Sequence, residues 1–126
     1  MADSPLACSR RGPRREVGGV KLYLIVRRDL APSARAVQLC HALRAFVEEH
    51  PAEDQVWFQQ SNTLVLLEVD DEDCLERLME KARSTGVSCA LFREPDIGDQ
   101  VTAIAIAPAG KRLVRGLPLA TLGVGV

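Results

Sequence analysis

Four short apolar runs separated by polar segments predict four β-strands. Residues 20–26 (VKLYLIV) are almost continuously apolar and rich in strand formers, which is typical of a central strand buried on both faces. Residues 63–69, 87–92 and 101–107 are the other three runs. The charged residues Arg27, Arg28 and Asp29 mark the carboxyl end of the first strand, the edge at which ligands usually bind in open α/β sheets.

Two segments between these runs have apolar side chains at helical spacing. The first, residues 34–49, has Ser33 as its expected N-cap and ends before Pro51. The second begins after Asp70, its expected N-cap, and ends near Gly86. Residues 51–61 are mostly polar and are expected to form a loop or a short irregular segment.

The resulting order β-α-β-α-β-β predicts an α/β fold with a mixed four-stranded sheet flanked by helices. A ferredoxin-like βαββαβ arrangement is the main alternative and requires a strand at residues 55–59. We expect residues 1–18 to be a flexible tail, residues 19–119 to be the domain and residues 120–126 to be a loose C-terminus.

Composition fits one soluble domain, because the chain has 126 residues, 47% apolar residues and a net charge of −1. No apolar run is long enough to predict a membrane segment, and the cytoplasm is the expected location. The charge is uneven: residues 1–47 have nine basic and three acidic side chains, whereas residues 48–99 have four and fourteen. Basic ends around an acidic middle fit either a phosphate-binding face or an ordinary solvated surface.

Several common sites are absent from the sequence. No Gly-rich phosphate loop follows the first strand, no G-x-S-x-G elbow occurs, and the four cysteines form no CxxC pair, so we expect no cofactor and no metal. Gln38 and His41 stand out, since side chains three residues apart on a helix can converge on one ligand. The alternative is that His41 packs near the sheet with its ring nitrogens bonded to the backbone, and that Gln38 is simply exposed.

Three segments resemble the peptidyl-tRNA hydrolase type 2 family. That family has an R-x-D-L turn, a helix with the pattern G-K-x-A-A-Q-x-x-H-A, and a D-x-G-R-T-Q loop before a T-V-x-A-I-G-P strand. The matching segments here are RRDLAPSARAVQLCHAL (27–43) and EPDIGDQVTAIAIAP (94–108), with a strand and a helix between them. The most specific match is the Q-x-x-H-A element, residues 38–42.

The chain also departs from the family pattern. Ala34 stands where the family has a lysine, and Arg35 is the nearest cation. The loop is shorter than the family's, with Asp96, Gly98 and Gln100 as loose counterparts of its residues.

The resemblance implies hydrolysis of the ester between a peptide and the terminal ribose of tRNA, without a cofactor. It implies that Asp96 orients water or acts as a general base, that Gln38 and Thr102 are positioning groups, and that His41 is a proton relay or a strut between helix and sheet. Contacts to tRNA would come from four arginines: Arg27, Arg28, Arg35 and Arg93. With an aromatic content of only 4%, we expect the RNA contacts to involve mainly the backbone.

Two other functions remain open. One is a non-catalytic tRNA- or protein-binding descendant of the same fold, which the missing lysine favours. The other is a ferredoxin-like regulatory module that binds a metabolite between subunits. A homodimer is possible in either case.

Overall fold

The structure, a computed structural model, describes residues 20–123. The predicted tail, residues 1–18, and the last three residues lie outside the described part. In chain order the elements are β1 (Lys21–Arg27), α1 (Pro32–Glu49), α2 (Pro51–Gln60), β2 (Thr63–Val69), α3 (Glu72–Ser84), β3 (Cys89–Glu94), the 3-10 helix η1 (Pro95–Ile97), β4 (Gln100–Ile106) and the 3-10 helix η2 (Pro108–Val114).

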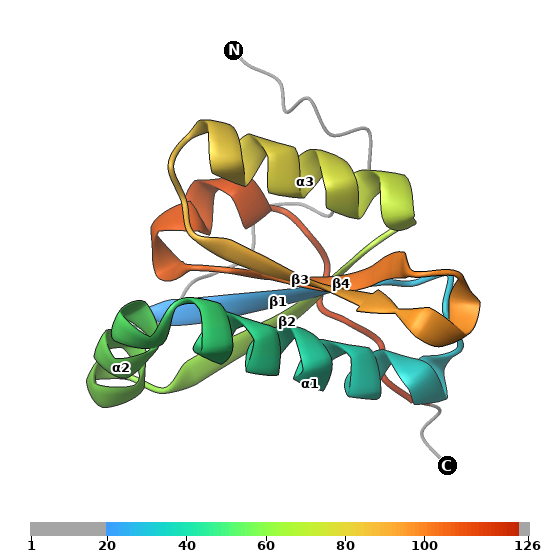
Figure 1. The fold of residues 1–126 in the computed structure, drawn as a ribbon, viewed down its shortest axis with the longest axis horizontal. Coiled ribbons are helices and arrows are strands. Elements are labelled where there is room, and N and C mark those ends of the chain that lie inside the picture. Colours follow the sequence, from blue (N-terminus) through green and yellow to red (C-terminus); the bar gives the residue numbers. More distant parts are fainter. Residues whose placement is uncertain (1–19, 124–126) are drawn as a thin grey trace.

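The four strands form one mixed sheet in the order β2-β1-β4-β3. β1 is parallel to β2 and antiparallel to β4, and β3 is antiparallel to β4. Helices α1 and α2 cover one face, while α3 and η2 cover the other (Figure 1). The α/β class and the mixed four-stranded sheet are therefore confirmed, with α2 as an additional element.

Strand β1 lies in the middle of the core, and all seven of its residues are buried. Alternate side chains point to opposite faces of a strand. Leu22, Leu24 and Val26 consequently belong to the cluster under α1, and Tyr23 and Ile25 to the cluster under α3. Each fully buried aliphatic side chain contributes about 1.5–3 kcal/mol to folding.

The expected loop at residues 51–61 is wrong, because Pro51–Gln60 forms helix α2. Pro51 ends α1 and also begins α2, since its fixed φ suits the first turn of a helix and it has no N–H to satisfy there. The Trp57 side chain is buried, and its Nε1 donates to the Thr63 carbonyl oxygen at 2.8 Å. The ferredoxin-like alternative is excluded, because it needs a strand in this segment.

Both expected N-caps are shifted. Ala31, rather than Ser33, caps α1, with Pro32 in the first turn. Asp71, rather than Asp70, caps α3 and accepts a hydrogen bond from the Cys74 amide at 3.0 Å. Asp70 instead forms an ion pair with Arg28, at 2.8 Å.

Strand β4 contains a β-bulge at Thr102. Phe92 pairs with Ala103 and Arg93 pairs with Val101, so Thr102 has no direct partner on β3. Without a bulge, Thr102 would share the α3 face with Ile104. The extra residue reverses that alternation and turns the Thr102 side chain toward α1.

The polar segment at residues 93–100, expected to be a loop, contains the ends of β3 and β4 joined by η1. The tight turn after η1 uses Gly98 and Asp99, both at positive φ. Beyond η2, the Ala120 amide donates to the Leu66 carbonyl and Leu119 forms a bridge with Leu67.

Candidate functional site

A buried polar cluster lies between the first half of α1 and the β3–β4 hairpin. Gln38 faces the sheet together with Leu39, Ala42 and Phe46, and its side chain is only 6% exposed. Thr102, turned toward α1 by the bulge, is completely buried. The structure therefore brings two of the predicted site residues into direct contact.

Two hydrogen bonds hold the Gln38 amide in one orientation. The Thr102 hydroxyl donates to Gln38 Oε1 at 2.6 Å, and Gln38 Nε2 donates to Glu94 Oε1 at 2.8 Å. A carboxylate accepts but does not donate, so Glu94 selects the Nε2 side of the amide. The Thr102 hydroxyl, which can donate or accept, then donates to the oxygen side.

Glu94 is a site residue that the sequence analysis missed. It is the last residue of β3, half-buried, and its second carboxylate oxygen accepts from the Asp96 amide at 3.4 Å. Because Glu94 lies in a charged segment between two predicted strands, the sequence suggested that it is a solvated loop residue. The available signal was its spacing, because Phe92 and Glu94 lie on the same face of β3 as the buried Ala90.

Asp96 lies two residues further, in η1, and is exposed. Among residues 20–123 its carboxylate has no hydrogen-bond or ion-pair partner. Asp96 is thus at the rim of the cluster and not in contact with Gln38.

His41 lies one turn after Gln38 and is exposed. Its ring stacks on that of Phe92, with centroids 4.3 Å apart and an interplanar angle of 22°. This contact agrees with the alternative in which His41 packs against the sheet, although Gln38 is buried.

Arg27, at the end of β1, is buried and has several partners. Its guanidinium binds both Asp29 carboxylate oxygens, at 2.9 and 3.0 Å, and donates to Gln100 Oε1 at 2.7 Å. The Asp29 hydrogen bond raises the pKa of Arg27 above its ordinary value, against the opposing effect of burial. Arg27 joins the end of β1 to the start of β4.

Arg35 and Arg28 lie on the adjoining edge. Arg35 donates to the carbonyl oxygens of Leu30, Thr121 and Arg28, at 2.9, 2.7 and 2.6 Å. The Arg28 side chain is 45% exposed beside Asp70. Arg35 is therefore held by backbone groups, whereas Arg28 is more accessible.

Arg93 lies on the opposite face of the sheet from Gln38. It lines a shallow depression with Met79 and Val101, and its guanidinium donates to the Asp99 carbonyl at 3.2 Å. The structure does not bring Arg93 together with the polar cluster.

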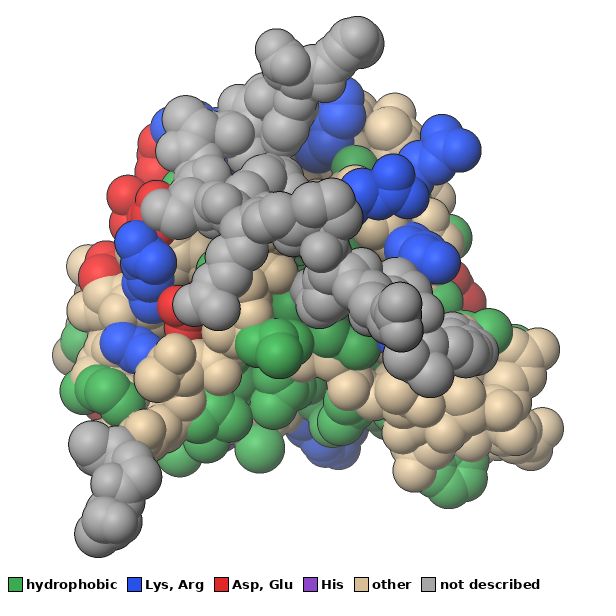
Figure 2. Space-filling view, turned by 180° about the vertical axis from the view of Figure 1, so that it is seen from behind, with side chains coloured by type: hydrophobic (Ala, Val, Ile, Leu, Met, Phe, Trp, Pro, Cys, Tyr) green, Lys and Arg blue, Asp and Glu red, His purple; other side chains and the backbone are tan. Residues whose placement is uncertain are grey.

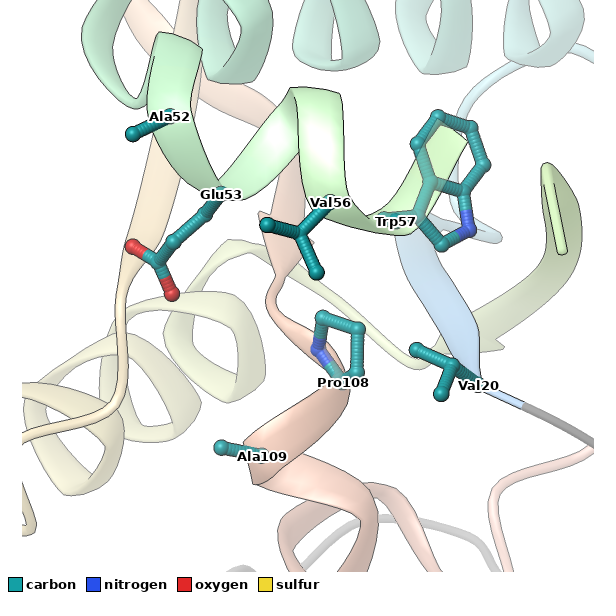
Figure 3. A pocket seen from close by; sticks show the side chains of 7 residues that line it. All are labelled: Val20, Ala52, Glu53, Val56, Trp57, Pro108 and Ala109. Carbon is teal, nitrogen blue, oxygen red and sulfur yellow. The ribbon is translucent and has the colours of Figure 1, made fainter. Parts of the chain in front are cut away.

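An apolar hollow of about 330 Å³ lies at the other end of the sheet (Figure 3). Val56 and Trp57 of α2 face Pro108 and Val20 across it. Val20 precedes β1 and Pro108 follows β4, whereas the polar cluster is near the start of β4. This hollow is thus separate from the cluster.

Within the described part of the chain, no group of three His, Cys, Asp or Glu side chains is arranged to hold a metal ion. The cluster offers one carboxylate, one amide and one hydroxyl in contact, with a free carboxylate at its rim. Such a set can orient water and donate hydrogen bonds to an oxyanion.

Comparison with known proteins agrees with the sequence motifs. A curated peptidyl-tRNA hydrolase from Thermococcus onnurineus (strain NA1) is 28% identical over 104 residues, which cover 75% of this chain and 88% of the relative. A solved structure of a protein of unknown function from Agrobacterium tumefaciens strain C58 matches with a TM-score of 0.61 at 12% identity, covering 82% of this chain and 99% of that one. That likeness concerns the fold alone.

The family model described as Peptidyl-tRNA hydrolase PTH2 matches residues 20–117. This range includes both halves of the polar cluster, on α1 and on the β3–β4 hairpin. The chain belongs to the peptidyl-tRNA hydrolase PTH2 family.

Proposed function

We propose that this protein hydrolyses the ester that joins a peptide to the terminal ribose of tRNA. The observation behind the proposal is the oriented amide of Gln38, held by Thr102 and Glu94 in the two segments that match the family motifs. Family membership supplies the substrate class.

Ester hydrolysis adds water to the carbonyl carbon and creates a negatively charged tetrahedral oxygen. Preorganised donors that stabilise this oxygen accelerate such reactions strongly. The bond from the carbonyl carbon to the ribose oxygen then breaks, and this oxygen takes up the proton that the attacking water has lost. The products are the free hydroxyl of the ribose and the carboxylic acid of the peptide, which ionises at neutral pH. No covalent nucleophile is needed, because the ester oxygen of the ribose is a fairly good leaving group when a second hydroxyl lies next to it.

Gln38 fits the role of the donor. An amide nitrogen has two N–H groups, and Glu94 accepts only one of them. Among residues 20–123 the second has no acceptor, so it is available to a substrate carbonyl. Glu94 and Thr102 are positioning residues, since they act through Gln38.

Asp96 fits the role of the group that orients water. Its carboxylate is exposed and unpaired within the described residues, and its amide is tied to Glu94. A carboxylate that accepts a proton from the attacking water contributes roughly 10²–10⁴-fold to a rate. The four arginines remain candidates for tRNA contacts, and Arg28 is the most favourably placed, because it is exposed on the same edge as Gln38.

The test is release of the blocked aminoacyl group from N-acetyl-aminoacyl-tRNA in metal-free buffer. We expect Gln38→Ala to reduce kcat by roughly 10²–10³-fold, the usual effect of losing one oxyanion donor. We expect Asp96→Asn to reduce kcat by at least about 10²-fold.

Matched controls are Gln59→Ala and Asp54→Asn, both on α2. Gln59 bonds only to Gln55 among the described residues, so neither control should change kcat. A wild type without turnover would refute the proposal, and full activity in Gln38→Ala would refute the assigned role of the amide.

A non-catalytic tRNA-binding protein is the second candidate. The observation in its favour is Ala34 in the family's lysine position, because the neighbouring Arg35 is held by three carbonyl groups and does not substitute for the lysine. Under this alternative, tRNA binds at low salt but is not hydrolysed.

We propose a cytoplasmic location, where peptidyl-tRNA is produced. Within residues 20–123, the structure has no helix of the length and apolarity that crossing a membrane requires. A homodimer stays a prediction, which sedimentation equilibrium would check.

A further inference from the structure

We propose that the stacked rings of His41 and Phe92 form a subsite for the terminal nucleobase of the tRNA substrate. This inference rests on the proposed function and extends it, because it names the part of the substrate that binds beside the ester. It also assigns His41 to binding and not to proton transfer.

The geometry of the ring pair supports a stacking role. The two rings are close to parallel and 4.3 Å apart, so one face of His41 is covered by Phe92. Phe92 is half-buried in β3 and His41 is exposed, so the pair presents a supported ring at the surface. Flat π-surfaces of this kind bind nucleobases by stacking.

An exposed apolar side chain adjoins the pair. Val37 lies one helical turn before His41 and is 52% exposed. Large exposed apolar side chains near a polar cluster are typical of a site that is covered when its ligand binds.

The pair also lies at the right place relative to the ester site. His41 follows Gln38 by three residues on one helix, a spacing that makes side chains neighbours. Phe92 precedes Glu94 by two residues on the same strand face, a rise of about 7 Å. One ribose separates the terminal base of tRNA from the ester bond, so a base on His41 would bring the ester to Gln38.

Proton transfer by His41 has less support. Among residues 20–123 neither ring nitrogen of His41 forms a hydrogen bond with another side chain or with the backbone. A proton relay needs such a partner at each end, directly or through water.

Two substitutions separate the roles. His41→Phe keeps an aromatic ring and removes both nitrogens, whereas His41→Ala removes the ring as well. We expect His41→Ala to raise KM for N-acetyl-aminoacyl-tRNA by roughly 5- to 150-fold, the range for loss of one base-stacking contact, with little change in kcat. We expect His41→Phe to keep both constants close to those of the wild type.

Arg44→Ala is the matched control on the same helix. Arg44 is exposed and pairs only with Glu48 among the described residues, so its loss should leave KM unchanged. A large fall in kcat for His41→Phe, with KM unchanged, would overturn the proposal in favour of proton transfer.

A binding measurement keeps this inference distinct from the proposed function. The chain has two histidines, so their ring protons can be followed by NMR during titration with the trinucleotide CCA. We expect upfield shifts for His41 and none for His50, which bonds to the Cys89 carbonyl at the far end of α1. The trinucleotide CCC should give smaller shifts, because a pyrimidine stacks less strongly.

The results of the two experiments distinguish the base subsite from the proposed function. His41 shifts without tRNA hydrolysis would support the subsite and refute the proposed function. Hydrolysis without any His41 shift would refute the subsite and leave the proposed function in place.

Discussion

The Glu94 carboxylate decides which way the Gln38 amide points. If the amide were flipped, its oxygen would face the Glu94 carboxylate and its nitrogen would face the Thr102 hydroxyl. The first contact would be repulsive, because both atoms only accept hydrogen bonds. The three side chains thus restrict a rotation that is otherwise inexpensive for glutamine.

Replacing Thr102 by valine tests this restriction. Thr102→Val has nearly the same shape but cannot donate, so the buried Gln38 oxygen loses its partner. We expect the free energy of unfolding to fall by about 1–3 kcal/mol, measured by urea denaturation. Thr102→Ser keeps the hydroxyl and should retain more of the hydrolytic activity than Thr102→Val, and the opposite order would contradict the role given to the hydroxyl.

At the scale of elements, α1 and β3 run side by side with opposite chain directions. Gln38 meets Glu94, His41 meets Phe92 and His50 meets Cys89, so successive contacts descend β3 as α1 advances. The polar cluster is held by α1 on one side and by the β3–β4 hairpin on the other. The geometry of the proposed site therefore depends on how these two elements pack.

Helix α3 covers the opposite face of the sheet from the polar cluster. Substitutions in α3 can therefore change the stability of the fold without touching the proposed site. Asp71→Ala removes the N-cap bond to the Cys74 amide, and we expect a loss of about 1 kcal/mol in the free energy of unfolding. The control Asp73→Ala removes an exposed pair with Arg77, which solvent screens, so we expect a smaller loss than for Asp71→Ala. Thermal unfolding of both variants, with their kcat, would check that α3 supports the fold and not the reaction.

At the scale of the whole molecule, charge is unevenly distributed over the surface. On the face that Figure 2 shows, acidic side chains lie mainly along the left side, where basic side chains also lie, and a group of basic side chains lies at the upper right. Glu72 and Asp73 lie in the first turn of α3, whereas Lys81 and Arg83 lie in its last turn, which suits the helix dipole.

Arg35 joins parts of the chain that are distant in the sequence. Two of its carbonyl partners, Arg28 and Leu30, lie in the turn between β1 and α1, and the third, Thr121, lies after η2. The Glu68 carboxylate, which also accepts from the Thr121 amide, lies 4.0 Å from the Arg35 guanidinium. We expect Arg35→Ala to lower the free energy of unfolding by about 3 kcal/mol, because Glu68 is left buried without a cation. Weaker tRNA binding with unchanged stability would instead make Arg35 an RNA contact.

The sequence predicted the four strands and the fold class, because short runs of apolar residues report burial directly. Residues 63–69 match β2 in full. Helix α2 escaped prediction because its side chains are mostly polar and only Trp57 is buried. The pattern of apolar and polar residues cannot reveal a short helix in which a single tryptophan packs into the core.

The site was only partly predictable. Gln38 and Thr102 followed from motif resemblance, but their contact depends on the bulge, which depends on pairing with β3. For Glu94, the spacing from Ala90 indicates only which face of the strand the side chain is on, and its partner Gln38 is 56 residues away in the sequence. Long-range pairing decides these details, and periodicity along a single segment does not report it.

The bulge at Thr102 has an evolutionary consequence. Because Thr102 is the unpaired residue, its deletion would leave Val101 opposite Arg93 and Ala103 opposite Phe92 as before. Every apolar residue of β4 would stay on its present face, so the hairpin would become regular while the threonine disappeared. The loss of one codon would therefore remove the hydroxyl that bonds to Gln38 and keep the pairing of β3 with β4.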